Sequence, residues 1–197
     1  MNYLAHIFLS GNDRQLQVGN FIGDFVKGRS HENYPKRIQE GIILHREIDS
    51  FTDSHPAFLE TVELMRPVFS RYSGIIADMY FDYFLASDFN RYSPERSLSC
   101  FTADFYLSVV LNYKWLPERV KGFIFHFIGT NRLKQYASYE GLQGSLHIMS
   151  LYKTSAINPE LSIAFLKQNE ETLRNHFQAF MPEVSSHLRG KVSDSCI

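Results

Sequence analysis

The sequence predicts an all-α protein, a single-domain helical bundle over residues 1–197, and three observations favour this fold class. Apolar residues recur at three- and four-residue spacings along most of the chain. Proline and capping residues divide the chain into segments of roughly ten to thirty residues, which suit helices. No series of alternating strands is visible, and Val is scarce beside Leu, Phe and Ile. With 197 residues, 44% of them hydrophobic and 15% aromatic, the chain can bury a sizeable core.

Helix-start and helix-stop residues set the expected boundaries in the first half of the chain. Asn12 and Asp13 can cap a helix that Gly28 ends. Pro35 and Pro56 are each suited to the first turn of a helix. The helices expected from these signals and from the apolar spacing span 15–28, 36–54, a stretch that begins at Pro56, and 73–89.

The second half carries two further start signals. The Ser-Pro pair at 93–94 predicts a helix that continues through Asn112, and the Asn-Pro pair at 158–159 predicts a C-terminal helix. Pro182 is expected to end or kink that last helix. Between them, residues 115–157 predict short helices broken by loops, because glycines and prolines interrupt an aromatic-rich stretch.

Charge and composition limit the classes of partner. Lys and Arg total 20 and Asp and Glu total 21, a net charge of −1 that gives no global attraction to nucleic acid or anionic lipid. The expectation is therefore no nucleic-acid partner and no membrane partner. No apolar stretch approaches the roughly 18 residues of a membrane span, and the first residues lack an export signal. Two cysteines, Cys100 and Cys196, cannot form a disulfide framework, which favours a reducing cytoplasm.

Two predicted helices carry acids on the face that points to the core. In the 36–54 helix, a projection at 100° per residue sets His45 and Asp49 among apolar neighbours, and Asp53 follows one turn later. In the 73–89 helix, Asp78 and Asp82 lie on the apolar face in the same way. Two helices thus direct ionisable groups toward one interior.

Buried acids need a positive partner, since an unpaired buried charge costs several kcal/mol. Arg46 and Arg71 could supply it as internal salt bridges. A divalent cation would answer more of the pattern at once, because an imidazole and carboxylates from two helices are ligands of the kind that bundle cores use for metals. This ligand type suits Mn²⁺, Mg²⁺ or Fe²⁺ better than structural Zn²⁺, although Zn²⁺ stays open.

Two weaker candidates come from the first 30 residues. His6 lies among apolar residues and taken alone would be an ordinary core histidine. Asp24 follows Gly23, and a small neighbour lets a ligand or a second backbone come close to an acid. The alternative for Asp24 is an exposed acid beside Lys27.

The reaction expected of such a centre is phosphoester hydrolysis, because a divalent cation polarises a phosphoryl oxygen and lowers the pKa of a bound water. The sequence has no GxxxxGK[ST], GxSxG or HExxH motif, so P-loop, nucleophile-elbow and zincin chemistry have no support.

Four sequence blocks occur in order over about residues 1–90: MNYLAHIFLS, GNFIGDFVKG, GIILHREIDSFTDSHP and DMYFDYFLA. Their order and spacing resemble the acyl carrier protein phosphodiesterase family, also called acyl carrier protein hydrolase. The resemblance implies an all-helical relative of the HD-domain phosphohydrolases that depends on Mn²⁺ or a similar ion. It implies cleavage of 4′-phosphopantetheine from the serine of holo-acyl carrier protein, which leaves apo-acyl carrier protein.

The resemblance and the projection together give the predicted site. The predicted metal ligands are Asp24, His45, Asp49 and Asp78, and the predicted catalytic residues are His6, Asp53 and Asp82. The adjacent His-Asp pair that names the HD superfamily is missing, because Arg46 follows His45. Either a displaced acid such as Asp49 takes its place, or the link is too distant for assignment of ligands by analogy.

A protein substrate also requires a recognition surface. Carrier proteins are typically small and acidic, so a local basic surface is expected. The predicted substrate-binding residues are Lys27, Arg29, Lys36, Arg37 and Arg46. Two other functions stay open: a metal-dependent phosphohydrolase of a nucleotide or another small phosphoester, and a non-catalytic helical module that binds carrier proteins.

Overall fold

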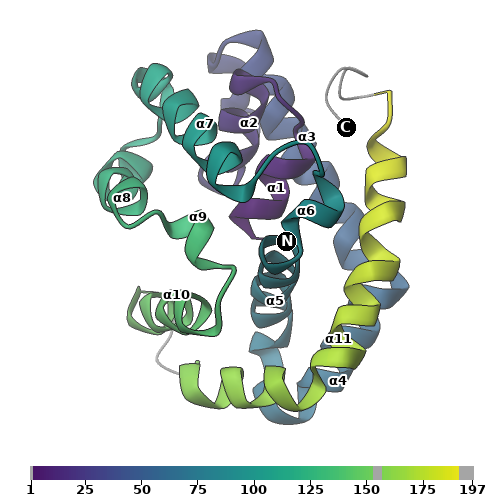
Figure 1. Cartoon of the computed structure of the whole chain (residues 1–197). Coiled ribbons are helices and arrows are strands. Elements are labelled where there is room, and N and C mark those ends of the chain that lie inside the picture. The colour runs from purple at the N-terminus through teal and green to yellow at the C-terminus, as the bar shows by residue number, and fades with distance from the viewer. Residues whose placement is uncertain (1, 153–156, 191–197) are drawn as a thin grey trace.

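A computed structural model describes residues 2–152 and 157–190, and all the regular elements in these ranges are helices, which confirms the all-α prediction (Figure 1). The first half of the chain forms α1 (Tyr3–Leu9), α2 (Arg14–Phe21), α3 (Lys36–Ser54), α4 (Pro56–Phe69), α5 (Ser73–Ser87) and α6 (Phe89–Tyr92). The second half forms α7 (Leu98–Leu111), α8 (Glu118–Gly129), α9 (Arg132–Gln135), α10 (Tyr139–Tyr152) and α11 (Pro159–Leu188). Short 3₁₀ helices are η1 (Gly23–Phe25), η2 (Ser30–Asn33), η3 (Ser70–Tyr72) and η4 (Tyr113–Trp115). Cys196 lies outside the described residues.

The helices pack around α5, which runs through the middle of the molecule (Figure 1). On one side of it α4 and α11 pack against each other, and α10 lies on the first half of α11. On the other side α1 contacts both α5 and α2, and α2 in turn packs on α3 and α7. The chain therefore brings its first helix between the central helix and the α2–α3 pair, where α1 carries His6.

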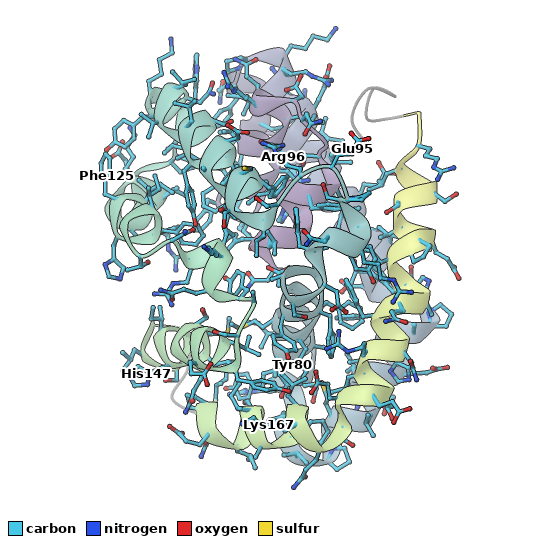
Figure 2. All side chains as sticks on the ribbon, viewed as in Figure 1. Tyr80, Glu95, Arg96, Phe125, His147 and Lys167 are labelled. Carbon is cyan, nitrogen blue, oxygen red and sulfur yellow. The ribbon has the colours of Figure 1, made fainter. Side chains whose placement is uncertain are left out.

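The core is rich in aromatic side chains. Tyr80 points inward from α5 and donates a hydrogen bond from its hydroxyl to the carbonyl oxygen of Ser162 at 2.6 Å (Figure 2). Phe125, in contrast, extends outward from α8 (Figure 2). The largest fully buried aromatic residues are Phe21, Tyr80, Phe81, Phe84, Phe105, Phe177 and Phe180. Burial of side chains of this size supplies most of the driving force for the fold.

The helix predicted over 15–28 is shorter than expected. Asp13 caps it, since its Oδ1 accepts the N–H of Leu16 at 2.8 Å, as predicted. The helix ends at Phe21, however, and Gly28 lies in a later loop with φ of +54°. The end of α2 is a run of poor helix formers, and the turn η1 that follows packs on α3.

The helix predicted to start at the Ser-Pro pair 93–94 starts four residues later. Ser97 is its cap, and the Oγ of Ser97 accepts the N–H of Cys100 at 3.2 Å. The Ser-Pro pair lies in the turn between α6 and α7. Two capping serines compete here, and Arg96 favours the second, because it donates to Asn12 Oδ1 at 3.0 Å and so ties this turn to the chain before α2.

The last two predictions have different outcomes. Short helices between 115 and 157 are confirmed as α8, α9 and α10. The C-terminal helix starts at Pro159 with Asn158 as its cap, as predicted, but it passes through Pro182 instead of ending there. Its non-helical backbone is at Asn169 instead, where the side-chain amide donates to the carbonyl oxygen of Phe165 at 3.0 Å. Buried residues on both sides of Pro182 hold the helix against the core despite the lost hydrogen bond.

Helices α2 and α3 approach each other too closely for any residue but glycine at their crossing. A Cβ atom added at Gly19 would lie 2.2 Å from the carbonyl oxygen of Ile38, and one added at Gly41 would lie 2.3 Å from the carbonyl oxygen of Leu16. A larger residue at either position would push the two backbones apart. This contact fixes the end of α2 against the middle of α3.

The variant Gly41→Ala should lower the free energy of unfolding by about 1–3 kcal/mol, because the added methyl group meets backbone atoms that cannot move aside. Urea-induced unfolding followed by circular dichroism measures the change. The matched control is Gly122→Ala on α8, where an added Cβ meets nothing within 4 Å. It should leave stability unchanged or raise it by up to about 1 kcal/mol. Equal unfolding midpoints for the two variants would contradict the close contact.

Candidate functional site

Two histidines and one aspartate from α1 and α3 form a compact cluster. The rings of His6 and His45 stack with centroids 4.1 Å apart and planes inclined by 24°. Asp49 bridges them, since its Oδ1 lies 3.1 Å from Nε2 of His6 and its Oδ2 lies 3.2 Å from Nε2 of His45. Both rings are buried, whereas the Asp49 side chain is 39% exposed. The cluster therefore meets solvent on its carboxylate side.

A fourth predicted residue, Asp24, reaches the cluster from the turn η1. Its Oδ1 lies 3.5 Å from Nε2 of His45, and its side chain is 60% exposed. The turn can come this close because Gly23 packs on the imidazole: a Cβ there would lie 2.3 Å from Cγ of His45. Arg46 holds the chain after the turn by donating to the carbonyl oxygens of Val26 and Gly28, at 3.1 and 2.8 Å.

Asp82 of the central helix α5 sets the position of α1, the helix that carries His6. The Asp82 carboxylate is fully buried and accepts the backbone N–H groups of Leu4 and Ala5, at 2.8 and 3.0 Å. Amides at the start of a helix have no partner within the helix and carry partial positive charge, so they suit a buried carboxylate. Asp82 thus acts on the site through the backbone of α1.

The remaining predicted acids lie apart from the cluster. Asp53 is exposed, one turn beyond Asp49 on α3. Asp78 is half-buried on α5, and its negative charge contributes to the raised pKa of Asp82. Within the described residues, neither belongs to the group whose ligand atoms converge. The projection was right that Asp82 faces inward, but α5 and α3 direct their acids to different partners.

Electrostatics separates the two histidines of the stack. Burial lowers the pKa of His45, but hydrogen bonds and charge attraction from Asp24 and Asp49 outweigh burial and raise this pKa to about 9. Burial lowers the pKa of His6 and outweighs the opposing effect of Asp49. For Asp49, burial raises the pKa, but the hydrogen bond and the positive charge of His45 prevail and hold it well below its usual range. Near pH 7 the cluster thus holds one anionic carboxylate, one neutral ring and one positive ring.

The predicted basic residues divide into exposed and engaged groups. Lys27 and Lys36 are exposed, and Arg29 is exposed while it pairs with Glu32 at 2.7 Å. Arg37 joins α3 to the cap of α2 by pairing with Asp13 at 2.9 Å. The arginines considered as internal partners have other contacts: Arg46 binds the two loop carbonyls, and Arg71 donates to the hydroxyl of Tyr72 at 2.7 Å.

The cluster fits a divalent metal ion. One ligand atom each from His6, His45 and Asp49 lie within 4.8 Å of one another, a spacing that one ion can bridge. Nε2 of His45 is buried and faces the carboxylates of Asp49 and Asp24 at 3.2 and 3.5 Å, so it is the His45 atom placed to bind an ion together with Asp49. Two imidazoles and a carboxylate are ligands that several first-row metals accept. Asp24 contacts His45, at 3.5 Å, but lies outside the group whose ligand atoms converge among the described residues.

Asn20 is a neighbour of the cluster that the sequence reasoning missed. It is fully buried at the end of α2, and its Oδ1 lies 2.8 Å from Nδ1 of His6. Its sequence signal was weak, because α2 carries a second buried amide, Gln17, beside its apolar residues. Gly23 is a point of close approach, as its small size predicts, and the group that approaches it is the imidazole of His45.

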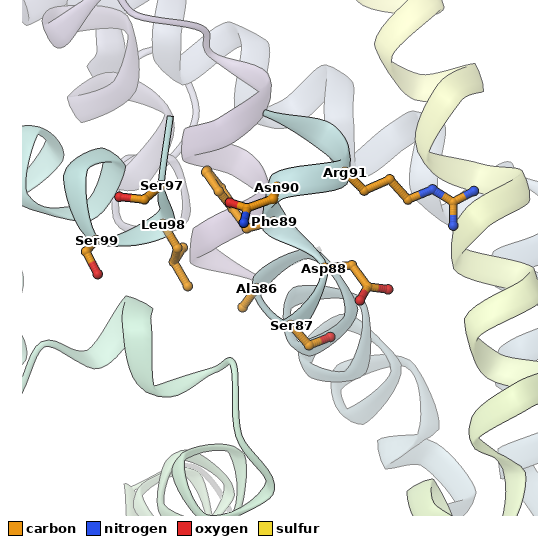
Figure 3. Close-up of a pocket in the computed structure, with 9 residues that line it drawn as sticks. All are labelled: Ala86, Ser87, Asp88, Phe89, Asn90, Arg91, Ser97, Leu98 and Ser99. Atoms are coloured by element: carbon orange, nitrogen blue, oxygen red, sulfur yellow. The ribbon is translucent and has the colours of Figure 1, made fainter. Parts of the chain in front are cut away.

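A surface pocket of about 580 Å³ lies elsewhere, between the end of α5, α6 and the start of α7 (Figure 3). Its polar lining includes Ser87, Asp88, Asn90 and Ser99. None of the predicted site residues lines it. The pocket and the histidine cluster are therefore separate features of the molecule.

Fold and cluster together define an all-α protein with a mixed imidazole–carboxylate centre suited to a divalent metal ion. The family model described as acyl carrier protein phosphodiesterase matches residues 1–184. The chain belongs to this family. No helix among the described residues combines the length and the apolar character needed to cross a bilayer.

Curated relatives agree with the family match. The chain is 28% identical to the acyl carrier protein phosphodiesterase of Enterobacter sp. (strain 638), over 97% of this chain and 99% of the relative. It is 29% identical to the protein of that name from Pectobacterium atrosepticum, over 91% of this chain and 90% of the relative. The protein of that name from Yersinia pestis is 26% identical, over 97% of this chain and 99% of the relative. No solved structure matches the chain, so the expected likeness to HD-domain phosphohydrolases stays a prediction.

Asp82 should make stability depend on pH. Burial is the main cause that raises its pKa to about 7, while the two backbone hydrogen bonds oppose the rise. Between the pKa of the unfolded chain and about 7, the folded protein binds more protons, so its stability falls as pH rises, by about 1 kcal/mol per pH unit.

The variant Asp82→Asn lacks this titration. The difference in unfolding free energy between the wild type and Asp82→Asn, measured by urea unfolding at intervals from pH 5 to pH 8, should shift against the wild type as pH rises and level off above pH 7. A difference that stays constant over this range would contradict an elevated pKa for Asp82.

Proposed function

We propose that this protein hydrolyses the phosphodiester that joins 4′-phosphopantetheine to the serine of holo-acyl carrier protein, which releases apo-acyl carrier protein and free 4′-phosphopantetheine. The observation that carries the proposal is the cluster of His6, His45 and Asp49 in a chain of the acyl carrier protein phosphodiesterase family. A phosphodiester is a substrate that such a metal centre can activate.

The proposed cofactor is a divalent metal, Mn²⁺ first, with Mg²⁺ or Fe²⁺ as alternatives, because the ligands are imidazoles and carboxylates without thiolates. His6, His45 and Asp49 would hold it, with Asp24 as a further oxygen ligand. When bound, such an ion polarises a phosphoryl oxygen, lowers the pKa of a water and offsets the negative charge of the transition state.

The solvent exposure of each cluster residue indicates its role in the proposed hydrolysis. Water attacks phosphorus, the bond from phosphorus to the serine oxygen breaks, and the serine oxygen leaves with a proton. Asp24 and Asp49 are the cluster members that reach solvent, so their oxygens can accept hydrogen bonds from a water and orient it beside the phosphodiester. His6 is too deeply buried to touch a protein substrate, which supports a ligand role for it over proton transfer to the serine.

The proposed partner is holo-acyl carrier protein, and the proposed compartment is the cytoplasm, in keeping with a chain that has only two cysteines. Lys27 follows Asp24 by three residues in the chain and is exposed. Lys27, Arg29, Lys36 and Arg46 are the exposed members of the predicted basic set. An acidic carrier protein would be drawn to this side of the molecule, where its serine can approach the cluster.

One incubation tests the proposal against its two alternatives. Purified protein is mixed with holo-acyl carrier protein and Mn²⁺, and the mass of the carrier protein is measured by mass spectrometry. Loss of the 4′-phosphopantetheine mass supports the proposal. An unchanged carrier together with hydrolysis of nucleotides or small phosphoesters would favour a general phosphohydrolase, and an unchanged carrier that binds the protein without any hydrolysis would favour a non-catalytic module.

The variant Asp49→Ala should lower hydrolysis of holo-acyl carrier protein at least about 100-fold. Loss of a residue that merely supports a metal ligand costs about 10- to 100-fold, and Asp49 bridges both histidines directly. The rate of apo-carrier formation measures the effect, and an unchanged circular dichroism spectrum verifies the fold. The control Glu63→Ala removes a surface acid that pairs with Arg66 at 2.6 Å and should keep full activity. Full activity in Asp49→Ala would refute its assignment.

The double reversal Lys27→Glu with Lys36→Glu should raise KM for holo-acyl carrier protein about tenfold, if each exposed charge contributes about 0.7 kcal/mol to binding. It should also weaken the salt dependence of KM and leave hydrolysis of a small phosphodiester unchanged. These two positions leave the ion pairs of Arg29 and Arg37 intact.

The matched control is Lys134→Glu with Lys167→Glu, which makes the same change of net charge on α9 and α11 (Figure 2 labels Lys167). Its KM should stay at the wild-type value. Equal KM values for the two double variants would argue against carrier binding by the basic residues near Asp24.

A further inference from the structure

A closed network of buried polar groups lies behind His6, on the side of the ring away from Asp49. Asn20 Nδ2 donates to the carbonyl oxygen of His6 and to Oγ of Ser10, both at 2.8 Å. Ser10 Oγ donates in turn to the same carbonyl oxygen at 2.8 Å. Asn20 and Ser10 are fully buried. A network of this kind is stable only if its donors and acceptors match.

The network fixes which nitrogen of His6 carries a proton. Because Nδ2 of Asn20 has two acceptors, the amide orientation is set and Oδ1 of Asn20 faces the ring as an acceptor. This oxygen lies 2.8 Å from Nδ1 of His6, so Nδ1 must donate to it. In a neutral imidazole with a proton on Nδ1, the lone pair lies on Nε2.

That lone pair is directed at the cluster. Nε2 of His6 lies 3.1 Å from Oδ1 of Asp49. A lone pair and a carboxylate oxygen repel each other at this distance, and a cation between them turns the repulsion into two attractions. Metal-binding histidines in general donate their second ring nitrogen to a fixed acceptor, which orients the ligand.

We propose that Asn20 is a positioning residue that accepts the Nδ1 proton of His6 and thereby holds Nε2 as a ready ligand for a divalent cation shared with Asp49. This inference extends the proposed function by naming what prepares its metal centre. Without Asn20, Asp49 would be the acceptor near this ring, and the proton would move to Nε2, where it blocks the metal.

The first test observes the tautomer directly, without metal or substrate. The protein is labelled with ¹⁵N-histidine, and nitrogen–proton correlation spectra are recorded at a pH where His6 is neutral. The wild type should show a proton on Nδ1 of His6 and none on Nε2. In Asn20→Leu the proton should move to Nε2, whereas Asn20→Asp keeps an acceptor oxygen and should retain the wild-type tautomer.

The second test measures the affinity for Mn²⁺ by the electron paramagnetic resonance signal of the free ion. Asn20→Leu should bind Mn²⁺ about 10- to 100-fold more weakly than the wild type. Asn20→Asp loses both amide donors, and so loses stability, but its affinity should stay within a few-fold of the wild type. The matched control is Asn112→Leu, which removes another buried amide, one that donates to the carbonyl oxygen of Ser108 at 2.8 Å, far along the chain from the cluster.

These outcomes separate positioning from a purely structural role. If Asn20 only stabilises the fold, Asn20→Asp and Asn20→Leu should lose Mn²⁺ affinity together and the tautomer should not follow the acceptor. A wild-type His6 without a proton on Nδ1, or an Asn20→Leu variant with unchanged tautomer and affinity, overturns the inference. A wild type that has the expected tautomer but leaves holo-acyl carrier protein intact overturns the proposed function alone.

Discussion

The site depends on how closely α2 and α3 approach each other. At their crossing, Gly19 and Gly41 each lie against backbone atoms of the other helix, where a Cβ atom would not fit. That contact brings the last turn of α2, with Asn20, and the turn that follows it, with Gly23, up to the segment of α3 that carries His45. If the two helices stood a few ångströms further apart, the turn of Asp24 could not rest on the ring of His45. A packing constraint made of the smallest residue thus controls the position of the most polar groups in the fold.

The third helix of the site is fixed by a different force. The buried carboxylate of Asp82 meets the first amides of α1 and so determines where that helix begins and which way it points. A buried acid raises the free energy of the folded state unless donors satisfy it, and here the donors belong to the element that must be placed. The buried acid therefore costs stability but orients α1. The central helix carries Asp82 where an apolar residue would pack, and His6 gains a defined position.

Much of the fold could be predicted because apolar spacing and capping residues act locally. Helix α3, the start of α11 at Pro159 and the cap at Asp13 all follow from such signals. The errors arise where distant contacts decide between local alternatives. Ser93 and Ser97 are both good caps, and Arg96 favours the second through its contacts with Asn12 and with Asp104 of α7. Pro182 is a strong stop signal, yet the packing of its neighbours overrides it.

The site shows the same division. His45 and Asp49 could be paired from one helix projection, because both residues lie on α3, and the rule that a buried acid needs a positive partner was sound. For Asp82 that partner is a pair of backbone amides, which no side-chain pattern reveals. The role of Asn20 also could not be read from sequence, because it depends on the carbonyl oxygen of His6 and on Ser10, which lie on an element ten or more residues away.

The two stacked rings belong to two different helices. His6 lies on α1 and His45 lies on α3, almost forty residues further along the chain, and Asp49 contacts both rings. An ion bound by these residues would cross-link α1 and α3, and its binding energy would add to the stability of the folded N-terminal half. Loss of the metal would then lower the thermal stability of the fold as well as stop hydrolysis. The melting temperature would therefore depend on the supply of the ion.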